Sequence, residues 1–87
     1  MANEPITMYT TTFCPDCLRA KRFLRDRGLA FREVNIEDDD EAERIVLQAN
    51  LGRRKVPTFA IGGRYFACSP FSATQLASEL GVPLNRS

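Results

Sequence analysis

The chain has 87 residues, and its twelve basic and eleven acidic side chains leave a formal net charge of +1. It has no histidine and no tryptophan, which excludes Ser-His-Asp triads, Cys-His nucleophile pairs and histidine-ligated zinc. The balanced charge creates no global field that would attract nucleic acid or a membrane surface, so we expect neither as a partner.

The first third of the chain predicts a strand followed by a helix. Residues 6–10 alternate apolar and polar side chains and are rich in strand-forming types. A helix of about residues 15–27 should follow, because Cys14 suits the N-cap, Pro15 the first helical position and Gly28 the residue after the C-cap. Its apolar residues are spaced for one buried face, made of Cys17, Ala20, Phe23 and Leu24.

A second strand and a second helix are predicted in the middle of the chain. Residues 31–36 have the alternation of a strand. The acidic run 37–41 leads into a helix of about residues 40–50, which Gly52 can close. We interpret the acidic run as capping and solvation, with a functional surface as the alternative. The apolar stripe of this helix is predicted to be Ala42, Ile45, Val46 and Ala49.

A β-hairpin is predicted next, over residues 58–61 and 64–67, because Gly62-Gly63 between them is a strong turn signal. The order strand, helix, strand, helix, hairpin and helix requires one parallel strand pair with a right-handed crossover, together with antiparallel strands. We therefore expect an α/β protein with a four-stranded mixed sheet and helices on both faces. A single domain over residues 1–87, with a core of about 5–81, fits this length.

The last helix has two candidate starts. Ser69 could be the N-cap with Pro70 at the first helical position, or Ser72 could form a capping box with Gln75. Gly81 is expected to end the helix. Its buried face should consist of Ala73, Leu76, Ala77 and Leu80.

The segment Cys14-Pro15-Asp16-Cys17 carries the chemistry. A Cys-x-x-Cys pair that begins a helix directly after a strand is typical of a thioredoxin-like redox motif. Thiol–disulfide exchange needs a thiolate, which the free amides of a helix N-terminus stabilise. We predict that Cys14, at the exposed end, attacks a disulfide and that Cys17, on the buried face, resolves the intermediate. Half of a zinc site, a structural disulfide and two unreactive cysteines remain alternatives.

Asp16 should modulate this chemistry. Its carboxylate lies in the first helical turn, where it opposes the positive potential that favours the Cys14 thiolate. We therefore expect a higher pKa for Cys14, and a more reducing disulfide, than with a neutral dipeptide between the cysteines. Basic residues that could offset the carboxylate are Arg19, Lys21, Arg22 and residues 53–55.

Val56-Pro57-Thr58 is the second notable segment. A proline at this point cannot belong to a central ladder, and by itself it marks only the start of a strand. Combined with a Cys-x-x-Cys pair earlier in the chain, it has a second interpretation. A cis peptide between Val56 and Pro57 would expose backbone beside the thiol, where an extended substrate could pair with it.

Over nearly its whole length, the chain resembles the glutaredoxin family of the thioredoxin superfamily. The resemblance is carried by residues 9–17, Val56-Pro57-Thr58 and Gly62-Gly63, and residues 53–58 are similar to small bacterial glutaredoxin-like and mycoredoxin proteins. It implies a thioredoxin-like (glutaredoxin) fold of order β-α-β-α-β-β-α and a thiol-disulfide oxidoreductase without a bound cofactor.

The resemblance also implies roles for individual residues. Cys14 matches the nucleophile, Cys17 the resolving cysteine and Pro57 the cis-proline, while the backbone of Val56 matches the position that holds the thiol or peptide. Further candidates for binding the substrate or thiol are Phe13, Pro15, Asp16, Arg54, Lys55 and Ser69.

The sequence departs from the family pattern after the hairpin. Glutaredoxins that use glutathione have a short acidic pair there, whereas this chain has no carboxylate in residues 68–72. The low-molecular-weight thiol that acts as co-substrate is therefore left open between mycothiol, glutathione and bacillithiol, with thioredoxin reductase as a direct alternative. Pro15 argues against an iron–sulfur role, because cluster-binding members generally lack a proline at that position.

We interpret the protein as a cytoplasmic, monomeric enzyme that reduces protein disulfides or mixed disulfides. An alternative is an NrdH-redoxin-like electron donor that thioredoxin reductase reduces. A non-catalytic zinc-binding or redox-sensing module is an alternative of another class. Cys68 is expected to be a packed core residue, with a third redox thiol as the alternative. The basic segment 19–27 is read as a solvated face rather than a docking surface.

Overall fold

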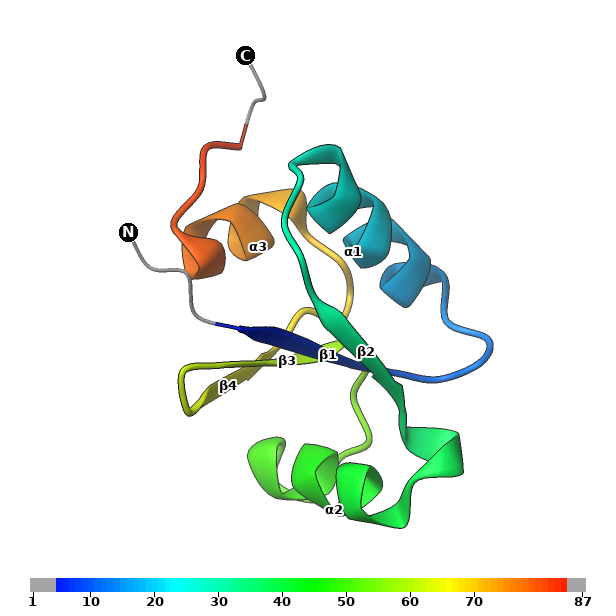
Figure 1. Cartoon of the computed structure of the whole chain (residues 1–87). Coiled ribbons are helices and arrows are strands. Elements are labelled where there is room, and N and C mark those ends of the chain that lie inside the picture. Colours follow the sequence, from blue (N-terminus) through cyan, green and yellow to red (C-terminus); the bar gives the residue numbers. More distant parts are fainter. Residues whose placement is uncertain (1–4, 85–87) are drawn as a thin grey trace.

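The computed structural model describes residues 5–84 as a central sheet with helices on both faces (Figure 1). The strands have the order β2-β1-β3-β4, in which β1 and β2 are parallel and the other two pairs are antiparallel. This confirms the predicted α/β fold with a four-stranded mixed sheet. In chain order, the elements are β1 (Ile6–Thr10), α1 (Pro15–Asp26), β2 (Arg32–Asn35), the 3₁₀ helix η1 (Ile36–Asp38), α2 (Asp40–Ala49), β3 (Thr58–Ile61), β4 (Arg64–Ala67) and α3 (Ala73–Leu80).

Helix α1 begins and ends as its capping residues predict. Cys14 is the N-cap, Pro15 occupies the first helical position, and Gly28 has a φ of +66° just beyond the helix. That φ lies in the left-handed region, where glycine has no Cβ penalty. The predicted buried face of Cys17, Ala20, Phe23 and Leu24 is confirmed.

The predicted apolar stripe of α2 is wrong at its last position, because Ala49 is exposed. The sheet-facing positions recur every fourth residue, at Ala42, Val46 and then Asn50. The Asn50 amide donates hydrogen bonds to the Val46 carbonyl at 2.8 Å and to Thr58 Oγ1 at 3.0 Å. A polar contact to β3 thus takes the place of the expected apolar one. The preceding strand is also shorter than predicted, since Ile36 already belongs to η1.

Helix α3 starts at the second of its two candidate caps. The Ser72 hydroxyl accepts a hydrogen bond from the Gln75 N–H at 3.1 Å, so the Ser69 alternative is wrong. The Gln75 side chain donates to the Ala67 carbonyl at 2.9 Å and so ties α3 to the end of β4. Residues 68–71 therefore form a connection instead of a helical turn. Gly81, with a φ of +70°, ends α3 as predicted.

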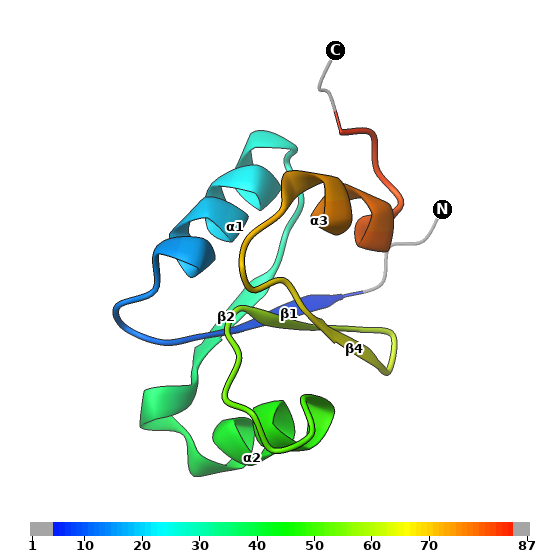
Figure 2. The same ribbon diagram turned by 180° about the vertical axis from the view of Figure 1, so that it is seen from behind.

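The two faces of the sheet bury separate apolar clusters. Met8 and Phe59 point toward α1 and α3, whereas Tyr9 points toward α2, as alternation along β1 requires. The view from behind shows α1 and α3 together on one side and α2 alone on the other (Figure 2). Within residues 5–84, none of the helices has the length and apolar character to cross a membrane.

Candidate redox-active site

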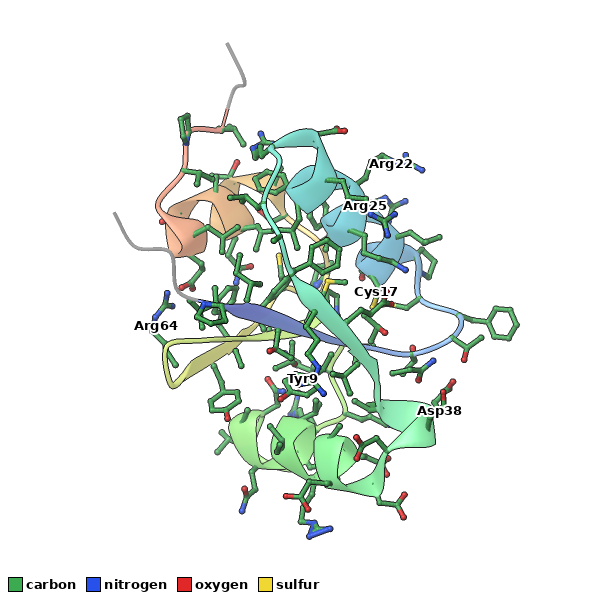
Figure 3. The ribbon with its side chains drawn as sticks, in the orientation of Figure 1. Tyr9, Cys17, Arg22, Arg25, Asp38 and Arg64 are labelled. Carbon is green, nitrogen blue, oxygen red and sulfur yellow. A yellow bond between two sulfur atoms is a disulfide. The ribbon has the colours of Figure 1, made fainter. Side chains whose placement is uncertain are left out.

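The two cysteines of the Cys-x-x-Cys segment are joined in a disulfide at the N-terminal end of α1. The Cys17 N–H points at Cys14 Sγ from 3.0 Å, which places this sulfur at the N-cap, among the free amides of the helix. Cys14 is 9% exposed and Cys17 is 2% exposed, so Cys14 is the more accessible sulfur but only by a narrow margin. Figure 3 shows Cys17 at the end of α1 that faces the loop after β1.

The turn before β3 lies against Cys14. The Val56–Pro57 peptide is cis, and the Val56 carbonyl oxygen is 3.8 Å from Cys14 Sγ. The turn is held by Thr58, whose hydroxyl donates to the Lys55 carbonyl at 2.6 Å, and by Cys68, whose N–H donates to the Pro57 carbonyl at 2.9 Å. The Val56–Pro57 backbone therefore lies beside the Cys14 sulfur, as the sequence predicted, and two hydrogen bonds hold its turn in place.

The remaining candidate residues are spread more widely than the sequence suggested. Phe13 and Pro15 flank Cys14 and are exposed, with Phe13 at 93%. Ser69 follows Cys68, the residue just after β4 whose N–H donates to the Pro57 carbonyl. Arg54 instead pairs with Glu43 of α2 at 3.0 Å, which directs its guanidinium toward that helix.

Asp16 is the carboxylate closest in sequence to both cysteines. It forms a salt bridge with Arg19 at 3.3 Å, one turn further along α1. Lys21 instead pairs with Glu33 of β2 at 3.1 Å, and Arg22 points outward from α1 in Figure 3. Of the cations that the sequence offered as a counterweight, Arg19 is the one in contact with Asp16.

We predict that Asp16→Asn will lower the pKa of Cys14 by a few tenths of a unit up to about one unit, because one negative charge leaves the first turn. The change should be measured in the reduced protein from the pH dependence of thiolate absorbance. Asp26→Asn is the matched control: it removes the same charge about 15 Å away along α1 and should leave the titration unchanged. Equal titrations of wild type and Asp16→Asn would contradict the prediction.

Cys68 lies in the core below this site. It has no exposed surface, and it belongs to the cluster between the sheet and the two helices α1 and α3. Its sulfur lies 3.4 Å from the Ser72 N–H and 3.5 Å from the Ser72 carbonyl oxygen. Burial raises the pKa of the Cys68 thiol, more than the Ser72 hydrogen bond lowers it. Both findings agree with the packed-residue interpretation.

We therefore expect only two of the three thiols of the reduced native protein to react with a chromogenic disulfide reagent within minutes at pH 8. A raised pKa keeps Cys68 protonated there, and burial denies access to the reagent. Cys17 is also buried, but it can attack the mixed disulfide that the reagent forms with Cys14, so this pair accounts for two equivalents. The third thiol should appear only after the protein is unfolded. Cys68→Ala should remove that late thiol alone, whereas three fast thiols in the wild type would refute a buried Cys68.

One polar cluster at the site escaped the sequence analysis. It joins the loop after β1 to the segment after β2, through Thr12, Asn35 and Glu37. Its signal is present in the sequence, because β1 and β2 are parallel and their carboxyl ends must lie at one edge of the sheet. Among the described residues, no group of three or more Cys, Asp or Glu side chains is placed to hold a metal ion.

Comparisons with known proteins agree with this geometry. The glutaredoxin family model matches residues 6–66. A glutaredoxin of Pseudomonas aeruginosa is 33% identical over 82 residues, which cover 93% of this chain and 96% of that protein. A protein of Mycobacterium tuberculosis that is named as a glutaredoxin is 41% identical over 80 residues, which cover 92% of this chain and 94% of that protein.

A solved structure of a related protein has the same fold as this chain. The glutaredoxin-like protein NrdH-redoxin from Escherichia coli is 32% identical and superposes with a TM-score of 0.61, over 72% of this chain and 80% of its own. The family model covers most of the chain, and the matched part includes both cysteines and the cis-proline turn. The chain therefore belongs to the glutaredoxin family of thiol-disulfide oxidoreductases.

Proposed function

We propose that the protein reduces disulfides of proteins, and mixed disulfides between a protein and a low-molecular-weight thiol, with Cys14 and Cys17 as its redox pair. The observation that carries the proposal is the position of Cys14 Sγ, 3.0 Å from the Cys17 N–H and 3.8 Å from the Val56 carbonyl oxygen. The first contact stabilises a thiolate. The second brings a backbone acceptor to the place where a bound substrate would lie.

The reaction has two exchange steps. The Cys14 thiolate attacks one sulfur of the target disulfide, a new S–S bond forms, and the second target sulfur leaves as a thiolate that takes up a proton. The Cys17 thiolate then attacks Cys14 Sγ and releases the first target sulfur. The two electrons have passed to the target, and the enzyme is left with the Cys14–Cys17 disulfide found in this structure.

The other site residues would bind and orient the substrate. The Val56 backbone is suited to pair with an extended peptide, and Phe13 offers an apolar ring 93% exposed beside Cys14. Pro15, Asp16, Lys55 and Ser69 complete the rim in this proposal. Arg54, which pairs with Glu43, would contribute only if it left that salt bridge. We place this activity in a cytoplasmic monomer.

Two reductants are candidates for returning the disulfide to the dithiol. The first is a low-molecular-weight thiol, namely mycothiol, glutathione or bacillithiol, and membership of the glutaredoxin family supports it. The E. coli NrdH-redoxin has a thioredoxin-like activity profile. Since residues 68–72 have no carboxylate, direct reduction by thioredoxin reductase is the second candidate function, that of an NrdH-redoxin-like electron donor.

The reductant can be identified with one substrate and four coupled systems. The protein would be given a mixed-disulfide substrate and NADPH, together with glutathione and its reductase, a mycothiol system, or thioredoxin reductase. A bacillithiol system would be run as a fourth arm. NADPH consumption that depends on one of the four identifies the partner, and no consumption with any of the four would contradict the proposed reductase function.

A further inference from the structure

The loop that leads into Cys14 is tied to the end of the adjacent strand β2 and the start of η1 by a closed ring of hydrogen bonds. Glu37 Oε1 accepts from the Thr12 N–H at 3.1 Å and from the Thr12 hydroxyl at 2.5 Å. The Asn35 amide donates to the Thr12 hydroxyl at 3.1 Å, and the Asn35 carbonyl oxygen accepts from the Glu37 N–H at 2.9 Å. We call these three residues the Thr12–Glu37 clasp. Every donor in the ring has an acceptor, so the three side chains define one arrangement.

The register of the sheet places the clasp. Thr10 and Asn35 are partners at the last position of the parallel pair β1–β2. Thr12 and Glu37 each follow two residues later, so both chains leave the sheet at the same edge and at the same level. Figures 1 and 2 agree that the loop after β1 and the segment after β2 lie at one end of the molecule.

The loop held by the clasp is short and ends at the nucleophile. Only Phe13 separates Thr12 from Cys14, and Phe13 is 93% exposed, so its side chain supplies no packing to hold the loop. Beyond Cys14, helix α1 is fixed through the buried Cys17 and Ala20. The clasp thus holds the backbone directly before Cys14, and two residues further back the Thr10 hydroxyl donates to Glu33 at 2.9 Å.

We propose that Glu37 is a positioning residue for Cys14, acting through Thr12 to keep the sulfur at the N-cap of α1. This role rests on the proposed function, because the Cys14 thiolate is stabilised as long as its sulfur stays 3.0 Å from the Cys17 N–H. The hydrogen bonds from Thr12 also lower the pKa of Glu37, so its carboxylate stays ionised at neutral pH. The positive charge of Arg54 also lowers the pKa of Glu37. The other charged groups next to it in the chain are the carboxylates of Asp38 and Asp39.

Charge and geometry predict opposite effects at this position, which makes the inference testable. Removing the negative charge of Glu37 would by itself favour the Cys14 thiolate. Releasing the loop would disfavour it, because the sulfur would spend part of its time away from the helix amides. Glu37→Gln removes the charge and keeps an oxygen that can accept from Thr12, whereas Glu37→Ala removes both.

The experiment measures the alkylation rate of Cys14 by iodoacetamide as a function of pH in the reduced full-length protein, with the labelled peptide identified by mass spectrometry. This rate reports thiolate formation and does not depend on any disulfide-reductase activity, so the inference and the proposed function can fail separately. We expect Glu37→Ala to be about 3- to 10-fold slower than wild type near pH 7, with its pH midpoint raised. Glu37→Gln should match or exceed the wild-type rate.

Two further variants complete the test. Thr12→Val keeps the charge of Glu37 but loses the hydroxyl bond, and it should fall between wild type and Glu37→Ala. Asp38→Ala removes a neighbouring carboxylate that Figure 3 shows pointing outward, and it should leave the rate unchanged. Equal profiles for Glu37→Gln and Glu37→Ala would mean that only the charge matters and would overturn the proposal. So would a Glu37→Ala variant that loses thermal stability but keeps the wild-type pH profile.

Discussion

Replacing Cys14 by serine is expected to lower turnover of a disulfide substrate by a factor on the order of 10³ or more, because a protonated hydroxyl replaces the thiolate nucleophile. The fold should survive the change. Cys14 caps α1 by accepting the Cys17 N–H, and a serine hydroxyl is a good N-cap acceptor for the same bond. The measurement is NADPH-coupled turnover, with thermal unfolding as the check that the variant remains folded.

Cys17→Ser is the matched control for that experiment, since it removes the partner sulfur and keeps the nucleophile. The first exchange step should still occur, so the variant should trap a mixed disulfide with the substrate that intact mass spectrometry detects. A substrate whose reduction needs only one enzyme thiol should still be turned over. With a protein disulfide, the reaction should stop at the mixed disulfide with Cys14. Residual activity in Cys14→Ser together with none in Cys17→Ser would reverse the two roles, with Cys17 as the attacking residue.

The sequence predicted most of the fold because its local signals were consistent with one another. Cys14, Pro15 and Gly28 mark the two ends of α1, and the spacing of its buried residues selects its inner face. Gly62 and Gly63, with φ of +56° and +80°, form the turn that their dipeptide predicts, since both positions require a left-handed backbone. Where a segment is governed by capping, turn chemistry or periodicity, nearby residues contain the information.

The sequence-based predictions were wrong or incomplete where the local structure depends on contacts with residues far away in the chain. Ser69 and Ser72 are both acceptable caps, and the choice depends on Gln75 reaching the Ala67 carbonyl of β4. Ala49 has the right spacing to be buried, but Asn50 takes the sheet-facing position because Thr58 offers it a partner. Thr12 and Glu37 are 25 residues apart, and their contact follows only from the parallel register of β1 and β2.

Phe59→Ala is expected to lower the free energy of unfolding by about 3–5 kcal/mol, the range for truncating a buried phenylalanine. Phe59 has no exposed surface, and its ring stacks on Phe66 with centroids 5.2 Å apart. It also lies on the central strand β3 and points toward α1 and α3, so the cavity would open in the core between the sheet and these two helices. The total free energy of unfolding of a small domain is only about 5–15 kcal/mol. A large loss of folded protein at 37 °C should therefore accompany the change in denaturant midpoint.

Phe13→Ala is the matched comparison, because it deletes the same side chain where 93% of it is exposed. Its free energy of unfolding should stay within about 0.5 kcal/mol of wild type, since the ring buries almost no surface on folding. If Phe13 binds protein substrates as proposed, kcat/KM should fall several-fold for a protein disulfide and remain unchanged for a small symmetric disulfide. Phe59→Ala should instead lower both activities in proportion to the unfolded fraction, because this buried ring contributes to stability and not to substrate contact. Equal losses on both substrates in a stable Phe13→Ala protein would assign that ring to thiol chemistry and not to substrate binding.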